Sequence, residues 1–169
     1  FSTENFSREK VEVKHLMSLF FSEFDKLIKS GRLEKKQIKV KFIGRLSMFE
    51  KKLHDKMDEM MEETKNYSNL TANFCMAYGG RAEIVDAVNK LIKNKKEITE
   101  QNITNNLYLS SEPELIIRTS EQRLSNFLMW QGAYSEIIFL PNKLWPEFTK
   151  QDLIDCVEEF NSRQRRFGK

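Results

Sequence analysis

The chain has 169 residues, of which 40% are hydrophobic and 31% are charged, and its mean hydropathy is -0.58. These values are typical of one soluble globular domain spanning residues 1–169, and no apolar run approaches the roughly 20 residues that cross a bilayer. The formal charge of +3 is too small to indicate a nucleic-acid-binding protein. Cys75 and Cys156 have no CxxC spacing, so we expect free thiols in a reducing compartment, and we predict a cytoplasmic protein.

The first half of the chain predicts two amphipathic helices separated by a strand. Apolar residues recur at helical spacing over 13–28, and Gly31 supplies a stop. The alternating residues 38–44 predict the strand, and Ser47 and Glu50 have the spacing of a capping box. The helix that follows carries large apolar side chains on one side: Phe49, Leu53, Met57, Met60 and Met61.

The second half alternates strand and helix patterns. Gly79 and Gly80 let the backbone turn between the strand at 70–78 and the helix that follows it. Thr149 is the expected N-cap of the last helix. This rhythm predicts an α/β fold with a mostly parallel central sheet flanked by helices, in which ligands bind beyond the carboxyl ends of the strands. In chain order we predict a strand at 70–78, helices at 84–92 and 100–107, a strand at 114–119, a helix at 123–131, a strand at 136–140 and a helix at 153–160.

Two arginines flank one predicted strand end. Arg118 closes the strand, Arg123 opens the predicted helix, and Ser125 follows closely. Guanidinium groups match phosphate oxygens, and a helix start adds unpaired backbone N–H groups. Surface salt bridges are the commoner fate of a single arginine, but a pair beside a strand end predicts an anion site.

A second polar cluster opens the chain and, with the first, carries a family resemblance. Ser2, Asn5, Arg8 and Glu12 surround the aromatic Phe6. Six strings resemble the cis-prenyltransferases, the family of undecaprenyl and dehydrodolichyl diphosphate synthases, and they occur in the family's order: FSTENF, AYGGRAEI, RTSEQRLSNFLMWQ, AYSEIIF, LWPEF and RRFG.

The resemblance implies condensation of isopentenyl diphosphate with an allylic diphosphate, such as farnesyl diphosphate, to a cis-polyprenyl diphosphate. It assigns the diphosphate of isopentenyl diphosphate to Arg118, Arg123 and Ser125. It places the opening cluster against the allylic substrate: Ser2, Asn5, Phe6, Arg8 and Glu12. Asn5 and Ser2 would share in removing the proton released at condensation, because general-base work depends first on reach. Phe6 reads equally well as a core aromatic.

The resemblance also implies a metal and a partner chain. Glu136 matches the family's magnesium-associated glutamate, and Glu121 a further acidic position, although each carboxylate alone would more often be merely exposed. The family is homodimeric, with residues 123–131 near the interface and the tail Arg165, Arg166, Phe167 and Gly168 reaching toward a partner's phosphate site. Contact with an anionic membrane surface is a minority interpretation of the basic residues 35–41. Apolar side chains of the first helices would line a tunnel for the growing isoprenoid, with Leu70 near its closed end; core packing is the safer interpretation.

Two departures qualify the resemblance. The family's N-terminal strand, turn and helix, which carry the MDGN aspartate, are absent from these residues, so we expect the 169 residues alone to lack synthase activity. The loop after Arg118 is TSEQ, one residue shorter than the usual TSGEQ, which would alter the aim of Glu121. The alternative function is a noncatalytic partner subunit of the same fold, although retention of Ser2, Asn5 and both arginines argues against it. Nucleic-acid binding is a distant third.

Overall fold

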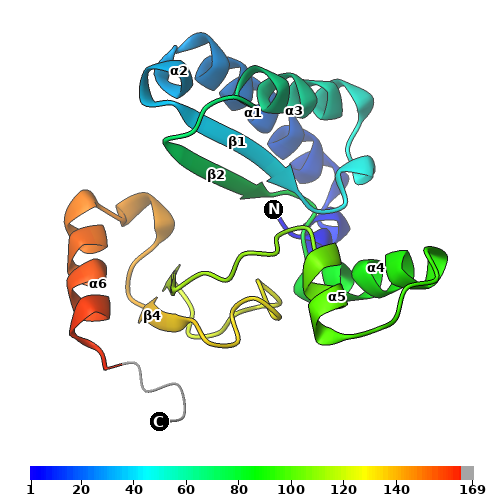
Figure 1. Cartoon of the computed structure of the whole chain (residues 1–169). Coiled ribbons are helices and arrows are strands. Elements are labelled where there is room, and N and C mark those ends of the chain that lie inside the picture. Colours follow the sequence, from blue (N-terminus) through cyan, green and yellow to red (C-terminus); the bar gives the residue numbers. More distant parts are fainter. Residues whose placement is uncertain (165–169) are drawn as a thin grey trace.

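All strands of the described chain are parallel. The structure is a computed structural model and describes residues 1–164. β1 (Ile38–Ile43) pairs with β2 (Leu70–Cys75), and β3 (Leu115–Thr119) pairs with β4 (Glu136–Leu140). The predicted α/β class with parallel strands is confirmed, although the strands form two separate two-stranded sheets (Figure 1). The tail from Arg165 to Gly168 lies outside the described residues.

Helices connect and cover these strands as the periodicity predicts. Gly31 adopts φ +66° just after the first long helix, a left-handed conformation that favours glycine, so the predicted stop is confirmed. The Thr149 hydroxyl accepts a hydrogen bond from the amide of Asp152 and caps the last helix, as expected. The helices are α1 (Lys10–Lys29), α2 (Arg32–Lys36), α3 (Lys51–Glu63), α4 (Gly80–Lys93), α5 (Glu100–Asn106) and α6 (Lys150–Ser162), with short 3-10 turns η1 (Thr3–Ser7), η2 (Leu46–Met48) and η3 (Trp145–Glu147).

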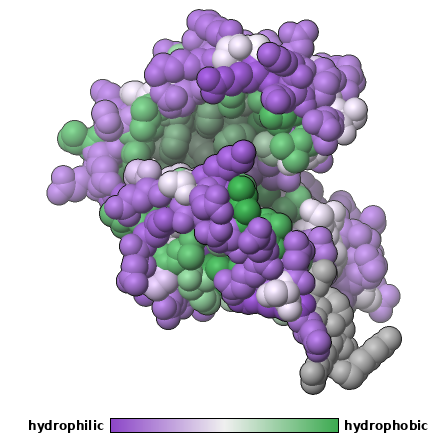
Figure 2. Space-filling model, turned by 90° about the vertical axis from the view of Figure 1, so that its left-hand side faces the viewer, coloured by the Kyte–Doolittle hydropathy of each residue, from purple (hydrophilic) through white to green (hydrophobic). Residues whose placement is uncertain are grey.

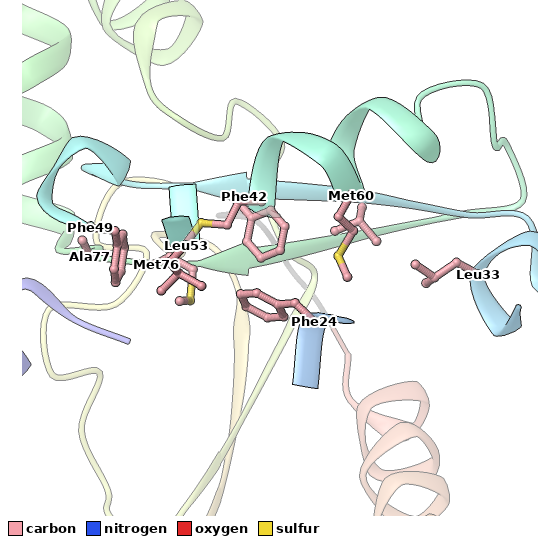
Figure 3. Close-up of a cluster of buried hydrophobic side chains, with 10 residues drawn as sticks. Phe24, Leu33, Phe42, Phe49, Leu53, Met60, Met76 and Ala77 are labelled. Atoms are coloured by element: carbon pink, nitrogen blue, oxygen red, sulfur yellow. The ribbon is translucent and has the colours of Figure 1, made fainter. Parts of the chain in front are cut away.

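The main core lies where α1 and α3 pack against each other and against β1 (Figure 3). The rings of Phe24 on α1 and Phe42 on β1 have centroids 4.9 Å apart. Met57 and Met60 of α3 are fully buried, in agreement with the predicted apolar side of this helix. Burial of these side chains supplies the hydrophobic free energy that fixes α1 and α3 beside the sheet.

The predicted helix over residues 123–131 is wrong. The segment between β3 and β4 is a series of turns, and Ser125, Asn126 and Leu128 have φ of +47°, +64° and +44°. These left-handed angles are incompatible with an α-helix. Tertiary bonds replace the helical ones, because the Asn126 carbonyl accepts the Gly80 amide at 2.7 Å and its side-chain oxygen accepts the Arg81 amide at 2.9 Å.

Two smaller expectations also fail. Ser47 lies in η2 rather than at a helix start, and Glu50 itself is the N-cap of α3 without a side-chain cap bond, so the predicted capping box is absent. The strand expected over 70–78 ends at Cys75, because the following residues turn toward the N-terminal segment.

One face of the molecule is hollowed. In Figure 2 hydrophobic residues line the hollow and hydrophilic residues frame it.

Apolar side chains of α6 also face solvent: Leu153, Ile154 and Val157. Within residues 1–164, no helix combines the length and the apolar character that crossing a bilayer requires.

Candidate active site

A small pocket forms where the opening segment meets the ends of β2 and β3. The Ser2 backbone forms a parallel bridge with Tyr78, because the Tyr78 amide donates to the Phe1 carbonyl and the Thr3 amide donates to the Tyr78 carbonyl, each at 3.1 Å. This pairing holds the polar residues after Phe1 beside Arg118. The pocket has a volume of about 270 Å³ and is lined by Phe1, Ser2, Cys75, Tyr78, Arg118, Ser125, Asn126 and Phe127.

The two arginines and the serine predicted to bind one anion converge on a single carboxylate. Arg123 donates to both oxygens of Glu121, with Nη2 to Oε1 at 2.6 Å and Nε to Oε2 at 3.1 Å. Arg118 Nη2 also donates to Oε2, and the Ser125 hydroxyl lies 3.4 Å from the same oxygen. Convergence is therefore present although the predicted helix start is not, and turns rather than a helix dipole aim these side chains.

This cluster favours a negatively charged group. Hydrogen bonding from Arg123 lowers the pKa of Glu121, with the charges of Arg123 and Arg118 as lesser causes. The same bond raises the pKa of Arg123. The donors are thus arranged for an anion, and Glu121 supplies that charge from within the chain.

The opening segment divides between two places. Asn5 Oδ1 accepts from the Ser2 amide at 2.8 Å and from the Ser2 hydroxyl at 3.0 Å, so these two predicted catalytic side chains do lie together. Phe6 and Arg8 instead line a larger cleft between α1 and α3, and Arg8 pairs with Glu12 at 2.5 Å.

The larger cleft has a volume of about 570 Å³ and both apolar and basic walls. Its apolar lining includes Phe6, Val13, Met17, Phe21 and Leu53, and its polar lining includes Arg8, Lys10, Lys14, Ser18, Glu50 and Lys52. Phe20 and Phe24 pack into the core instead. Leu70 is exposed at the start of β2 and is absent from this lining.

The comparisons with known proteins agree over almost the whole chain. Residues 1–168 match the family model described as "Putative undecaprenyl diphosphate synthase". The chain belongs to the cis-prenyltransferase family. It is 44% identical to an isoprenyl transferase of Thermotoga maritima, over 99% of this chain and 74% of the relative. It is 43% identical to a tritrans,polycis-undecaprenyl-diphosphate synthase (geranylgeranyl-diphosphate specific) of Thermoplasma volcanium, over 100% of this chain and 69% of the relative.

Solved structures of the cis-prenyltransferase family have the same fold. A probable undecaprenyl diphosphate synthase from Campylobacter jejuni is 38% identical, with a TM-score of 0.92 over 100% of this chain and 80% of that one. Lavandulyl diphosphate synthase from Lavandula x intermedia, solved in complex with dimethylallyl diphosphate, is 31% identical, with a TM-score of 0.92 over 100% of this chain and 76% of that one.

Glu136, the carboxylate that family resemblance assigns to magnesium, is paired with an arginine. Its Oε2 lies 2.7 Å from Arg163 Nη1, and this pairing raises the pKa of Arg163. In the described part of the chain no group of three or more His, Cys, Asp or Glu side chains is placed to hold a metal ion. A carboxylate is a ligand type that magnesium takes, but these residues alone do not make a complete magnesium site.

The buried polar residues behind the pocket are not evident from the sequence patterns. Glu83 of α4 is 1% exposed and accepts hydrogen bonds from the Tyr78 hydroxyl and Gln131 Nε2. The sequence patterns assign no role to these three residues. Asn126 Nδ2 also donates to Glu4 at 3.0 Å, joining the opening segment to the segment between β3 and β4. The spacing of Glu83, Ala87 and Leu91 on one side of α4 was the available signal, since all three are buried.

Proposed function

We propose that this cis-prenyltransferase condenses isopentenyl diphosphate with an allylic diphosphate to make a cis-polyprenyl diphosphate, in the manner of an undecaprenyl diphosphate synthase. The convergence of Arg118, Arg123 and Ser125 on one carboxylate carries the proposal. A diphosphate group has the same charge sign as Glu121 and more acceptor oxygens, so it satisfies these donors when it replaces that carboxylate.

The geometry supports a role for each side of the small pocket. Arg118, Arg123 and Ser125 hold the diphosphate of isopentenyl diphosphate, while the opening segment with Ser2 and Asn5 faces the reacting carbons. During condensation a carbon–carbon bond forms, the allylic carbon–oxygen bond breaks and one proton leaves. Negative charge develops on the departing allylic diphosphate, where Arg8 is the positive group of this chain, and the Ser2–Asn5 pair orients the acceptor of the proton.

The cleft between α1 and α3 is proposed as the site of the isoprenoid chain. Its apolar side chains, such as Phe6, Met17 and Phe21, match a hydrocarbon, and Arg8 at its edge matches an allylic diphosphate. Glu12 holds Arg8 in place through their ion pair. Phe6 thereby serves as an apolar wall between the cleft and the opening segment.

Further properties of the proposal come from family resemblance. These are farnesyl diphosphate as the allylic primer, a homodimeric assembly, a cytoplasmic location with contact at the membrane surface, and Mg2+ with Glu136 as one ligand. The single domain over residues 1–169 also stays a prediction. No nucleic-acid partner is proposed.

A noncatalytic partner subunit is the second candidate, and the Glu136–Arg163 pair favours it. An arginine that neutralises the expected metal ligand suits a scaffold better than a metal site. The Ser2–Asn5 pair and the convergent arginines favour the enzyme, because a scaffold has no physical need for them.

The decisive experiment follows incorporation of radiolabelled isopentenyl diphosphate into butanol-extractable product, with farnesyl diphosphate and magnesium. The same protein is titrated with isopentenyl diphosphate by calorimetry. We expect binding in the micromolar range, and extension by the native protein. Binding without extension, or absence of binding, would contradict the proposed activity and favour the noncatalytic subunit.

A further inference from the structure

Glu83 is a buried carboxylate with four hydrogen-bond donors around it. Its Oε2 accepts from the Tyr78 hydroxyl at 2.5 Å and from Gln131 Nε2 at 3.1 Å. Its Oε1 accepts from the backbone amides of Tyr108 at 2.8 Å and Leu109 at 3.2 Å. Glu83 is 1% exposed, so water does not satisfy these groups. A carboxylate with two oxygens is the side chain that can accept all four bonds.

The partners of Glu83 come from the two sides of the small pocket. Tyr78 is paired through its backbone with Phe1 and Thr3 and therefore holds the segment that contains Ser2. Gln131 follows the turns that contain Ser125, and its Nε2 also donates to the Leu109 carbonyl at 2.8 Å. Gln131 is itself 1% exposed. Glu83 is thus the shared acceptor that connects the two pocket walls from behind.

A ring contact makes the same connection. The rings of Tyr78 and Phe127 meet edge to face with centroids 5.9 Å apart, and both residues line the pocket. The Tyr78 hydroxyl fixes the angle of this ring because it donates to Glu83. A displaced carboxylate would therefore move Phe127, two residues from Ser125, as well as Gln131.

We propose that Glu83 is a positioning residue that fixes the Ser2 wall of the pocket relative to the Arg118–Ser125 wall, and thereby sets the affinity for isopentenyl diphosphate. This inference rests on the proposed function. Glu83 does not line the pocket and touches no proposed substrate position; it acts through Tyr78 and Gln131. Affinity depends on the spacing because isopentenyl diphosphate must place its diphosphate on the Arg118–Ser125 wall and its reacting carbons against the Ser2 wall at the same time.

Glu83→Gln is the discriminating substitution. It keeps the size of the side chain but replaces one acceptor oxygen with an NH2 group. This group then faces either the Tyr78 hydroxyl and Gln131 Nε2 or the two backbone amides, all of which are donors. Glu83→Asp keeps both acceptors on a shorter stem. Glu63→Gln on the exposed side of α3 is the matched control, since it makes the same chemical change away from the pocket.

The test is calorimetric titration of isopentenyl diphosphate into the wild-type protein and its variants. We expect about tenfold weaker binding for Glu83→Gln, a partial recovery for Glu83→Asp and no change for Glu63→Gln. Hydrogen exchange of the Glu83→Gln variant should accelerate at residues 1–6 and 124–131 but not in the core of α1 and α3. If Glu83→Gln does not fold, Tyr78→Phe takes its place, because it removes one donor to Glu83 without placing two donors against each other. We expect this variant to bind isopentenyl diphosphate about threefold more weakly.

The outcomes separate this inference from the proposed function. Unchanged affinity for isopentenyl diphosphate in Glu83→Gln would overturn the positioning role. If Glu83→Gln does not fold, unchanged affinity in Tyr78→Phe would overturn it. Exchange that accelerates equally in α1 and α3 would show a general loss of stability instead and would also overturn it. A wild-type protein that does not bind isopentenyl diphosphate would contradict the proposed function itself.

Discussion

Arg123 donates hydrogen bonds to both carboxylate oxygens of Glu121, from Nη2 to Oε1 at 2.6 Å and from Nε to Oε2 at 3.1 Å. Because Arg118 donates to the same carboxylate, the proposed diphosphate site is occupied by a side chain of the chain itself. An incoming diphosphate therefore competes with Glu121 for the two guanidinium groups. Substitution of Glu121 or of either arginine should therefore change the affinity for diphosphate.

Replacement of Glu121 by glutamine should tighten the binding of inorganic diphosphate when magnesium is absent. A neutral amide competes less for the arginines than a carboxylate does, because it carries no negative charge to attract the two guanidinium groups. We expect a gain of about three- to tenfold in affinity, or about 0.7–1.4 kcal/mol, measured by calorimetry at fixed ionic strength. Glu158→Gln on the exposed side of α6 is the control. Equal or weaker binding by Glu121→Gln would show that Glu121 does not compete for the site.

Substitution of Arg118 should weaken isopentenyl diphosphate binding by about ten- to a hundredfold in the alanine variant, because a half-buried guanidinium loses charge-assisted bonds. Arg118→Lys should recover only part of the affinity, since an ammonium group cannot present a planar pair of donors. The measurement is a titration beside the Arg32→Ala control, which removes an exposed arginine on α2. Normal affinity in Arg118→Ala would remove this residue from its assigned role.

The pair between Arg163 and Glu136 gives a test of the metal assignment. Arg163→Gln removes the positive group from Glu136 Oε2, so divalent cations should bind about threefold or more tightly if Glu136 is a ligand. Mn2+ binding followed by electron paramagnetic resonance measures this without reference to activity. The double variant Arg163→Gln/Glu136→Gln should lose the gain, and a gain that persists would place the cation elsewhere.

Truncation of the core between α1 and α3 should destabilise the protein substantially. Met57 is fully buried, so Met57→Ala leaves a cavity and should lower the free energy of unfolding by about 2–5 kcal/mol. Val85→Ala removes apolar atoms from a side chain that is 53% exposed, and its effect should stay within about 0.5 kcal/mol. Denaturant titration followed by circular dichroism measures both, and similar values for the two variants would contradict the proposed core.

The start of α6 should contribute a pH-dependent stability. Hydrogen bonding from Lys143, and then from Thr149, lowers the pKa of Asp152 from 3.8 to about 2. A carboxyl group with a depressed folded-state pKa stabilises the fold fully above its unfolded value and loses this contribution as the pH falls toward the folded value. The stability difference between wild type and Asp152→Asn should therefore be constant above about pH 5 and shrink between pH 4 and pH 2. A difference that stays constant down to pH 2 would exclude this assignment.

Hydrophobic periodicity determined the long helices and the strands from sequence alone. The pattern from Val13 to Ile28 locates α1, and the alternation of residues 38–44 locates β1, because each periodicity places apolar side chains on one face of a regular element. The strings shared with the cis-prenyltransferases likewise located both polar segments of the site. Arg118, Arg123 and Ser125 could be grouped from the sequence, because they are close together in the chain.

Tertiary structure alone decided the conformation and the partners of those polar segments. The sequence around Asn126 predicts a helix, yet its bonds to Gly80 and Arg81 override a local preference that is worth only tenths of a kcal/mol per residue. The pairing of Glu136 with Arg163 and the burial of Glu83 between two pocket walls are further examples. Such contacts join residues through the folding of distant segments, and a charged side chain's partner is set by three-dimensional proximity that periodicity does not encode.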